Sequence, residues 1–151
     1  MRVVVQVVED AKVTINQKEV AKIDRGYLLF VGFTHGDNKE KACKMASKIA
    51  KLRLFPDESG KTNLNIFKVN GSILSISQFT LYASVKDGNR PSFSTSMPGS
   101  ESEQLYDAFN EALRDLGLKV GTGVFGENMD ITFTNKGPFT LLLDSEELYG
   151  E

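Results

Sequence analysis

The sequence predicts an α+β domain in which two helices pack on mixed, mostly antiparallel sheets that curl toward a barrel. Three observations lead to this class: β-branched runs precede any helix signal, two amphipathic helical segments follow, and alternating runs close the chain. The 151 residues contain no tandem repeat and no linker with a shift in composition. We therefore expect one domain spanning residues 1–151.

The first part of the chain is rich in strand signals. Apolar, β-branched runs occupy residues 3–8, 13–15, 20–23 and 27–33, with a turn at residues 16–18 and a break at Gly26. The last of these runs is apolar almost throughout, which is typical of a central strand buried on both faces. Three or four strands should thus precede the first helix.

The first helix should begin at Asp37, with Glu40 three residues later completing a capping box. Apolar residues recur at helical spacing at Ala42, Met45, Ala46, Ile49 and Ala50. Lysines occupy the other faces, where a solvated surface is a simpler interpretation than an RNA-binding face. Cys43 lies at the edge of the apolar stripe, so we expect an inert thiol.

The second helix should begin at Ser100, with Glu103 three residues on, and end at Gly117 in the left-handed conformation. Its apolar stripe comprises Leu105, Ala108, Phe109, Ala112, Leu113 and Leu116. Before it, Asn70 and Gly71 predict a hairpin leading into a strand at 72–79. After it, strands are expected at 119–125, 129–135 and 139–143, with Gly137 and Pro138 between the last two.

Composition excludes several functional classes. The net charge of −2 and pI near 5.5 argue against a wholly basic nucleic-acid surface, so any RNA contact must come from a local patch. A single cysteine excludes an internal disulfide and fits a reducing compartment. No run approaches the ~18 apolar residues of a membrane span. We expect a cytoplasmic protein with no membrane association.

Two apparent motifs carry little weight. Residues 121–126 match the dinucleotide fingerprint G-x-G-x-x-G, but the following segment alternates like a strand and not like the required helix. His35 is the only histidine and lies in a turn, which argues against a histidine-based metal cluster or a serine-histidine triad. Acidic residues lack the spacing of a metal site. We expect no metal and no cofactor.

One long irregular segment, residues 83–99, is rich in Ser, Gly and Pro. Loops of this length inside a domain are usually functional. It carries Lys86 and Arg90, and Tyr82 and Phe93 are placed to stack on bases. This segment is the best candidate for an RNA-contacting arm.

Two short motifs carry the strongest functional signal: Ser77-Gln78-Phe79-Thr80-Leu81 and Asn135-Lys136-Gly137-Pro138-Phe139-Thr140. Each places small polar groups at the end of an apolar run, where a rigid sheet can hold them against a ligand. Neither contains a residue that titrates near neutral pH, so an enzyme built on them would act by positioning and hydrogen bonding. Ordinary strand-end and turn residues are the alternative interpretation.

The whole chain resembles the D-aminoacyl-tRNA deacylases, formerly called D-tyrosyl-tRNA deacylases. The resemblance rests on blocks in one order at residues 1–6, 52–55, 77–83, 88–93, 117–126 and 135–140. It implies a homodimer in which a cis Gly137–Pro138 bond enters the partner's pocket. There the two carbonyls would capture the α-amino group of a D-aminoacyl ester and leave no room for an L side chain; glycine could also enter. Asn135, Thr140 and Met129 are implied substrate-binding residues.

The resemblance also implies the chemistry of ester hydrolysis on tRNA. Ser77, Gln78, Phe79 and Thr80 form the implied catalytic set, with backbone N–H groups around Gln78 and Phe79 as an oxyanion hole. Phe79 would help to form the pocket for the terminal adenosine. The 2′-hydroxyl of the terminal ribose would help to activate water, and nucleophilic attack by Thr80 is the lesser option because no base is assured beside it. Lys86, Arg90 and Phe93 are the implied tRNA contacts.

The chain departs from the family pattern at two places. The family usually has Gln-Arg-Val where this chain has Gln6-Val7-Val8, so a charge-assisted anchor for the Gly-Pro loop is missing. Asp87 replaces a second basic residue beside Lys86. Two alternatives remain open: a relative with a trans Gly-Pro bond that removes wrongly attached L-amino acids, and a non-catalytic tRNA-binding module.

Overall fold

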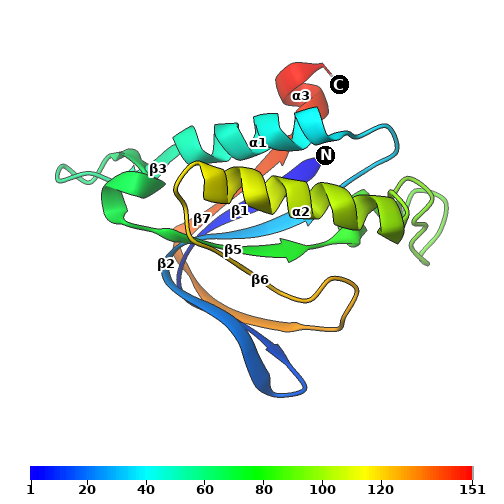
Figure 1. Ribbon diagram of the computed structural model, residues 1–151, viewed down its shortest axis with the longest axis horizontal. Helices are drawn as coiled ribbons and strands as arrows, with labels where there is room; N and C mark the ends of the chain where they lie inside the picture. The colour runs from blue at the N-terminus through cyan, green and yellow to red at the C-terminus, as the bar shows by residue number, and fades with distance from the viewer. Residues whose placement is uncertain (151) are drawn as a thin grey trace.

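Two long helices lie side by side over one face of a five-stranded sheet in the computed structural model, which describes residues 1–150 (Figure 1). The third helix is short and follows the last strand. The elements, in chain order, are β1 (Arg2–Ile15), β2 (Lys18–Gly32), α1 (Lys39–Lys51), β3 (Arg53–Pro56), β4 (Thr62–Asn65), the 3₁₀ helix η1 (Ile66–Val69), β5 (Ser72–Ser77), the 3₁₀ helix η2 (Phe79–Tyr82), α2 (Gly99–Asp115), β6 (Val120–Thr122), β7 (Asp130–Asp144) and α3 (Ser145–Tyr149).

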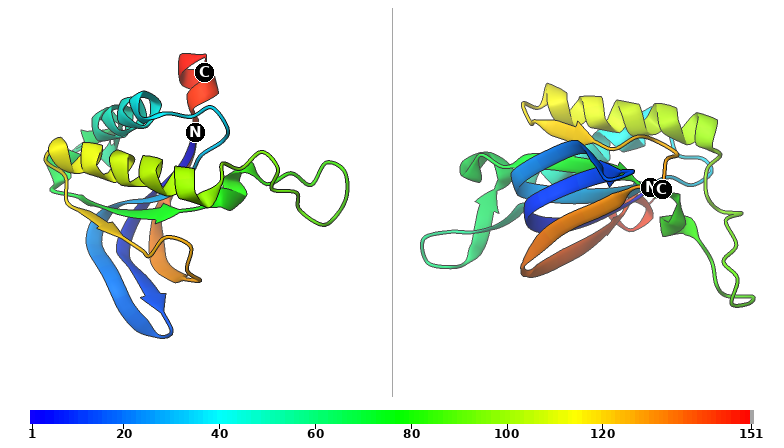
Figure 2. Two further views of the ribbon diagram at one scale, coloured as in Figure 1. Left: turned by 45° about the vertical axis from the view of Figure 1, so that its right-hand side comes forward. Right: turned by 90° about the horizontal axis from the view of Figure 1, so that it is seen from below.

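The main sheet is mixed and has the strand order β6-β5-β2-β1-β7. β1 pairs antiparallel with both β2 and β7, whereas β5 pairs parallel with β2 and β6. β3 and β4 form a separate antiparallel pair. The tip of the β1–β2 hairpin extends away from the helical layer in Figure 1 and in the left view of Figure 2. The predicted α+β class with a mixed sheet is confirmed.

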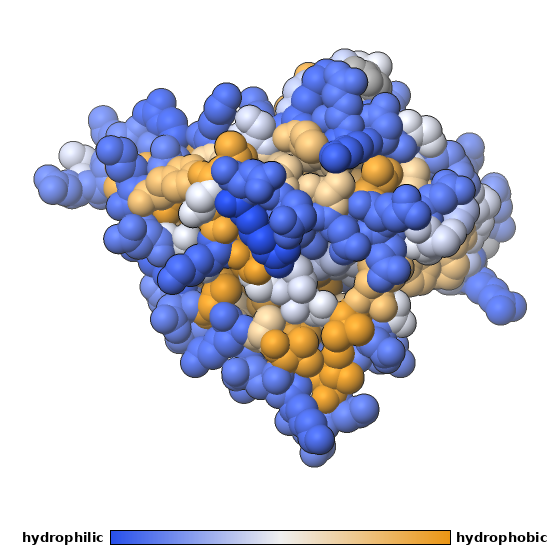
Figure 3. Space-filling view, viewed as in Figure 1, coloured by the Kyte–Doolittle hydropathy of each residue, from blue (hydrophilic) through white to orange (hydrophobic). Residues whose placement is uncertain are grey.

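Side chains from the two faces of the sheet form two hydrophobic clusters. Tyr27 and Leu29 pack toward the helices, while Leu28 between them packs in the second cluster, because successive strand residues point to opposite faces. This confirms that the 27–33 run is buried on both faces. On the face seen in Figure 3, hydrophobic residues also remain at the surface below α2, over the area of β6 and the β6–β7 loop, and Val124 of that loop is 45% exposed.

The first strands are longer than the sequence predicts. The four expected runs merge into β1 and β2, because β1 pairs with β2 at residues 9, 11 and 12 and the ladder also continues through Gly26. The predicted turn is confirmed, with φ of 50° at Asn16 and 67° at Gln17. Gly26 has φ 152°, and a Cβ there would lie 1.8 Å from the carbonyl oxygen of Ser72. The close approach of β5 to β2 therefore requires glycine.

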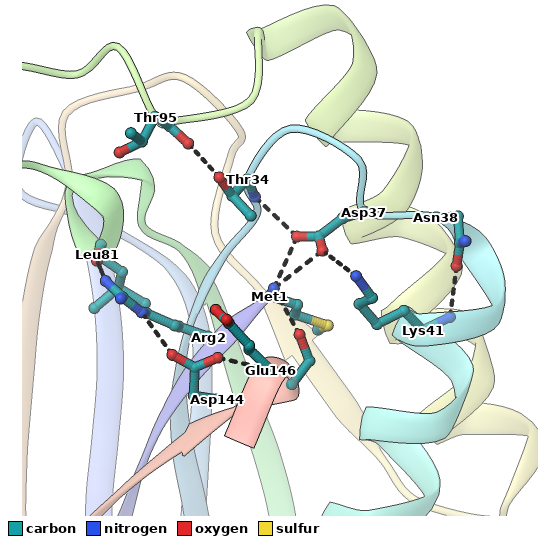
Figure 4. Close-up of polar contacts among 11 residues, drawn as sticks. Met1, Arg2, Thr34, Asp37, Asn38, Lys41, Leu81, Thr95, Asp144 and Glu146 are labelled. Atoms are coloured by element: carbon teal, nitrogen blue, oxygen red, sulfur yellow. Dashed lines mark hydrogen bonds and ion pairs between the residues drawn. The ribbon is translucent and has the colours of Figure 1, made fainter. Parts of the chain in front are cut away.

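Helix α1 begins one residue later than predicted. Asn38 is the N-cap, and its side-chain oxygen accepts a hydrogen bond of 2.9 Å from Lys41 N. Asp37, the predicted cap, instead accepts from the Met1 amino group, Lys41 Nζ and Thr34 N (Figure 4). The prediction of Asp37 was wrong because two ammonium groups take its carboxylate. The apolar stripe was correct, and all five predicted residues of it are buried.

Helix α2 begins at Gly99 after Pro98, and no side chain caps it, so the prediction of a Ser100 cap was wrong. Pro98 fixes the extended backbone that starts the helix, which a capping-box pattern does not detect. The predicted end is confirmed by Gly117, which has φ 100°. Leu116 lies beyond the last turn and is 45% exposed, so it does not belong to the buried stripe.

The turn at Asn70 and Gly71 does not form a hairpin. Asn70 has φ 52° and ends η1, and β5 then pairs in parallel with β2, with Ser72 opposite Gly26. The left-handed residue that favours a hairpin turn also suits the end of a helical turn, and local sequence does not separate the two.

The last part of the chain also differs from the prediction. β6 is only three residues long, β7 continues through Gly137 and Pro138 as one strand, and the short helix α3 was not predicted. The strand is not interrupted because β1 pairs with it on both sides of the Gly-Pro segment. Within residues 1–150, no helix is both long and apolar enough to cross a bilayer.

Candidate active site

A cavity of about 610 Å³ opens where β5 ends. Its walls come from the end of β5, from η2, from the loop before α2, from the first turn of α2 and from the β6–β7 loop. The lining residues are Ile76, Ser77, Gln78, Phe79, Phe93, Ser96, Met97, Pro98, Gly99, Ser102, Phe125, Gly126, Glu127, Asn128, Met129 and Ile131. Segments distant in sequence thus meet around one hollow.

The first sequence motif forms one wall of this cavity. Ser77 is the last residue of β5, and Gln78 N donates to Val31 O at 2.7 Å, after which the chain turns into η2. The predicted strand through Phe79 is therefore two residues too long. The Gln78 N–H is held by β2, whereas the N–H of Phe79 lies at the first position of η2, where the turn itself provides no acceptor.

Two aromatic rings form the mouth of the cavity. Phe79 is 54% exposed and Phe93 is 43% exposed, and their ring centroids lie 4.9 Å apart in an edge-to-face arrangement. Exposed aromatic faces at a cavity are suited to stacking on a planar ligand. Phe93, chosen from the sequence as an RNA contact, lies in the same site as Phe79.

Thr80 does not line the cavity. Its Oγ1 accepts a hydrogen bond of 2.5 Å from Gln78 Nε2, and within the described residues no imidazole or carboxylate is bonded to it. A threonine hydroxyl needs a neighbouring base to act as a nucleophile. The geometry therefore favours a positioning role for Thr80.

Hydroxyl groups of the following loop hold η2 in place. Ser96 Oγ donates to Phe79 O at 3.0 Å, and Thr95 Oγ1 donates to Tyr82 O at 2.6 Å. On the other side, η2 packs closely on Gly32, where a Cβ would lie only 2.9 Å from Gln78 O. Sequence reasoning missed these residues, since the Ser-rich composition of the loop was the only signal for them.

The opposite wall is the β6–β7 loop. Met129 lines the cavity as predicted, and a Cβ on Gly123 would lie 2.3 Å from its sulfur, so any larger residue there would have to displace the Met129 side chain. No helix follows the G-x-G-x-x-G segment; β7 follows it, which confirms that the segment is not a dinucleotide fingerprint. Glu127 is the one ionisable side chain among the residues lining the cavity.

The second motif forms a bulge in β7. Gln6 pairs with Thr140 and Val8 pairs with Asn135, so residues 136–139 lie opposite Val7 alone. Gly137 and Pro138 form the exposed tip, and the peptide bond between them is cis. Bulges of this kind commonly redirect a segment at a functional site.

A hydrogen-bond network closes the base of this bulge. Asn135 Oδ1 accepts from Phe139 N at 2.8 Å, and Asn135 Nδ2 donates to Gln6 Oε1 at 2.7 Å and to Thr140 Oγ1 at 2.9 Å. The side chains of Asn135 and Thr140 thus form hydrogen bonds within the base of the bulge. Gln6 was not identified from the sequence as part of this arrangement.

A hollow of about 300 Å³ lies beside the bulge, and Val7 is one of its lining residues. Apolar residues form most of its lining, and Arg25 from β2 reaches it, with the guanidinium 5.2 Å from the ring centre of Phe55. No cation comes from β1 at this point. Lys136 and Glu9 form an ion pair at 3.5 Å across the bulge, but both are exposed, so the pair adds little rigidity.

The structure unites some of the sequence-predicted residues and not others. Ser77, Gln78, Phe79, Phe93 and Met129 share one cavity. Seven others lie outside its lining: Thr80, Lys86, Arg90, Asn135, Gly137, Pro138 and Thr140. The two motifs are therefore separate within one chain.

Lys86 and Arg90 lie in a loop that projects from the body of the molecule (Figure 2). Two hydrogen bonds of 2.8 Å between Ser84 and Ser92 close the loop at its base. Lys86 also lines a second, open groove beside Arg2 and Tyr82. Neither basic residue of the loop lines the cavity.

Titratable groups outside the cavity offer no evident chemistry. His35 is exposed, and its Nε2 lies 2.8 Å from Ser94 O. Burial raises the pKa of Tyr82, so its phenol stays neutral at physiological pH. Within residues 1–150, no three His, Cys, Asp or Glu side chains are grouped to hold a metal ion.

Comparisons with known proteins agree on one family. The sequence profile of the family described as D-Tyr-tRNA(Tyr) deacylase matches residues 4–144. A D-aminoacyl-tRNA deacylase of Lactobacillus gasseri is 52% identical, with 95% of this chain and 99% of that protein covered. The Anoxybacillus flavithermus protein of the same name is 51% identical, with 97% and 100% covered.

Solved structures share the fold. The structure titled c-Myc DNA Unwinding Element Binding Protein superposes with a TM-score of 0.89 at 36% identity, covering 95% of this chain and 98% of that one. A second, titled as a probable eukaryotic D-amino acid tRNA deacylase, has a TM-score of 0.82 at 18% identity, covering 94% and 97%. The latter likeness concerns the fold alone.

Proposed function

Since this chain belongs to the D-aminoacyl-tRNA deacylase family and is a hydrolase of D-aminoacyl-tRNA, we propose that the cavity at the end of β5 is where the ester is cleaved. The observation that carries this assignment is the Phe79–Phe93 pair beside the Phe79 N–H, which lies at the first position of η2 where the turn itself provides no acceptor. The rings would stack on the terminal adenosine, and the adjacent backbone would face the ester that joins this nucleoside to the amino acid.

Hydrolysis at this site proceeds by positioning. The Phe79 N–H stabilises the oxyanion of the tetrahedral intermediate, a contribution of ~2.7–4 kcal/mol for one donor. The 2′-hydroxyl of the terminal ribose helps to activate the attacking water, since the cavity lining offers only Glu127 as an ionisable group. Ser77 orients the substrate directly and Thr80 does so through its hydrogen bond with Gln78; Thr80 as nucleophile remains the lesser option because its hydroxyl accepts from Gln78 Nε2 and has no base beside it.

A second copy of the chain completes the site. Gly137 and Pro138 are exposed and absent from the cavity lining of their own chain. In a two-fold homodimer each bulge enters the partner's cavity, where the carbonyl groups of Gly137 and Pro138 bind the substrate α-amino group. Each subunit in this dimer is one catalytic domain, spanning residues 1–151, whose sheet curls toward a barrel.

Chirality is selected by exclusion in this arrangement. A D side chain points outward, an L side chain meets the Gly-Pro bulge, and glycine has no side chain to exclude, so glycine mischarged on tRNA is also hydrolysed. Lys86 and Arg90 contact phosphates of the tRNA through the projecting loop, and Phe93 contacts its terminal base. Such chiral proofreading serves translation and belongs in the cytoplasm.

Release of amino acid from D-Tyr-tRNA and L-Tyr-tRNA, measured side by side with the wild type and Pro138→Ala, tests the function. Loss from the D-substrate alone is expected. Loss from both would indicate the L-removing alternative, and loss from neither, with tRNA still bound, would leave a non-catalytic tRNA-binding module.

Mixing two inactive variants tests the two-chain site separately. Phe79→Ala damages the cavity and Pro138→Ala damages the bulge, so a mixed dimer contains one intact site. Random exchange of subunits should restore about a quarter of the wild-type activity, since half of the dimers are mixed and each has one intact site out of two. If no activity returns after exchange is verified, the cavity and bulge do not act across subunits.

A further inference from the structure

Arg2 at the start of β1 connects the end of the sheet to the turn that carries Phe79 and Thr80. It lies opposite Asp144 in the β1–β7 register, and its Nε donates to Asp144 Oδ2 at 3.0 Å. Asp144 Oδ1 accepts from Glu146 N at 2.9 Å, which fixes the carboxylate at the start of α3 (Figure 4). The carboxylate that binds Arg2 is therefore itself fixed by the backbone of α3.

The same guanidinium reaches the candidate active site. Its Nη1 donates to Leu81 O, in η2, at 2.8 Å, and its carbon lies 4.5 Å from the ring centre of Tyr82. A planar guanidinium presents several donors in fixed directions, so one group can serve both the Asp144 carboxylate and the Leu81 carbonyl. Arg2 therefore links β1, β7 and η2.

Within residues 1–150, Arg2 is the one charged side chain that donates a hydrogen bond to η2. The other side-chain donors to the backbone carbonyls of this turn, Thr95 and Ser96, are neutral hydroxyls. Hydrogen bonds from charged donors are roughly twice as strong as neutral ones. Removing Arg2 should consequently loosen the turn more than removing either hydroxyl.

We propose that Arg2 is a positioning residue for the reaction: it fixes η2 so that the Phe79 ring and N–H stay aligned with the bound ester. This inference rests on the function proposed for the cavity. Arg2 does not line the cavity, so it acts through the turn and touches neither the ester nor the stacked base. A shift of this turn by even 1 Å can cost about 100-fold in rate.

The rival role for Arg2 is a direct phosphate contact, because it also lines the open groove that contains Lys86. The two roles affect different kinetic constants. A positioning residue lowers kcat with KM for tRNA little changed, whereas a phosphate contact raises KM and makes binding depend less steeply on salt.

Arg2→Met is the main variant, because it keeps an unbranched side chain without the donors. Arg114→Met is a matched control: Arg114 has a similar exposure, pairs with Glu111 at 2.6 Å and donates to the carbonyl of Val120 at 3.0 Å, but lies outside η2 and the cavity. With D-Tyr-tRNA, we expect kcat to fall about tenfold or more for Arg2→Met, with KM within about threefold. Arg114→Met should keep both constants.

Arg2→Lys separates charge from geometry. The lysine ammonium is a point charge that cannot donate to both Asp144 and Leu81 in the fixed directions of the guanidinium, so this variant should recover only part of kcat. Full recovery would indicate that charge alone matters. A raised KM with unchanged kcat in Arg2→Met would overturn the positioning role in favour of a phosphate contact.

Amide hydrogen exchange of residues 79–83 provides a readout that does not require activity. In this segment Leu81 N donates to Gln78 O and Ala83 N donates to Thr80 O. The amide hydrogens of Leu81 and Ala83 should exchange faster in Arg2→Met than in wild type, and at the wild-type rate in Arg114→Met. If wild type fails to deacylate, the proposed function fails while exchange still tests the link. Unchanged exchange in Arg2→Met, or equal acceleration in the control, would refute the inference.

Discussion

Replacing Asn135 tests whether the base of the β7 bulge determines activity. Asn135→Ala removes the acceptor of Phe139 N–H, now at 2.8 Å, and the donor to Gln6 Oε1 at 2.7 Å and to Thr140 Oγ1 at 2.9 Å, so that Gln6 Oε1 keeps only Thr140 Oγ1 at 3.4 Å. Each such bond contributes about 0.5–1.5 kcal/mol net. Because the bulge is partly exposed, water replaces some of this, and we expect an overall destabilisation of about 1–2 kcal/mol.

The effect on catalysis should exceed the effect on stability. The bulge supplies the proposed amine-binding carbonyls, so a loosened bulge should lower kcat/KM for D-Tyr-tRNA by roughly 10- to 100-fold while thermal unfolding stays cooperative. Asn135→Asp keeps the acceptor for Phe139 N but loses the amide group that donates to Gln6 and Thr140. Its activity should lie between those of Asn135→Ala and wild type.

Lys136→Ala is the control within the same bulge. Its ion pair with Glu9 spans 3.5 Å between exposed groups and is worth less than about 1 kcal/mol. Deacylation by this variant should remain within about threefold of wild type. Equal activity of Asn135→Ala and Lys136→Ala, with both folded, would refute the reasoning that the Asn135 network positions the bulge.

Three further predictions concern the turn, the histidine and pH. Gly32→Ala places a Cβ 2.9 Å from Gln78 O, so it should displace η2, lower kcat several-fold and cost about 1–3 kcal/mol of stability; unchanged kinetics would show that the turn has room. His35→Ala should keep deacylation within about twofold, as the ring is exposed outside the cavity, and a loss above tenfold would assign it a role in the reaction. Burial raises the pKa of Asp144, but hydrogen bonds from Arg2 and Glu146 N outweigh it and hold that pKa below its ordinary value. Because the folded-state pKa is depressed, this stabilisation is present above about pH 4 and is lost as pH falls through the folded pKa. Lowering the pH should therefore reduce the free energy of unfolding of wild type more than that of Asp144→Asn; an equal decrease for both proteins between roughly pH 5 and 3 would contradict it.

Local patterns in the sequence identified most elements but misplaced their ends. The α1 stripe and the Gly117 end of α2 follow from helical periodicity and left-handed backbone geometry, and both were correct. The cap at Asp37 was wrong because the carboxylate binds groups distant in sequence. Capping rules consider only neighbouring residues and cannot detect such competition.

The sequence by itself determined the fold class, the family and the two motifs, since periodicity, turn residues and short blocks are local properties. Only the tertiary structure decided that Gln78 N–H is taken by Val31, that Phe93 meets Phe79, and that Asn135 serves Gln6 and Thr140. Gln78 meets Val31 because β5 lies beside β2, and Asn135 meets Gln6 because β7 lies beside β1, whereas Phe93 reaches Phe79 through the path of the loop before α2. Strand order is fixed by packing of the whole chain, so the partners of a polar group cannot be read from its neighbours in sequence.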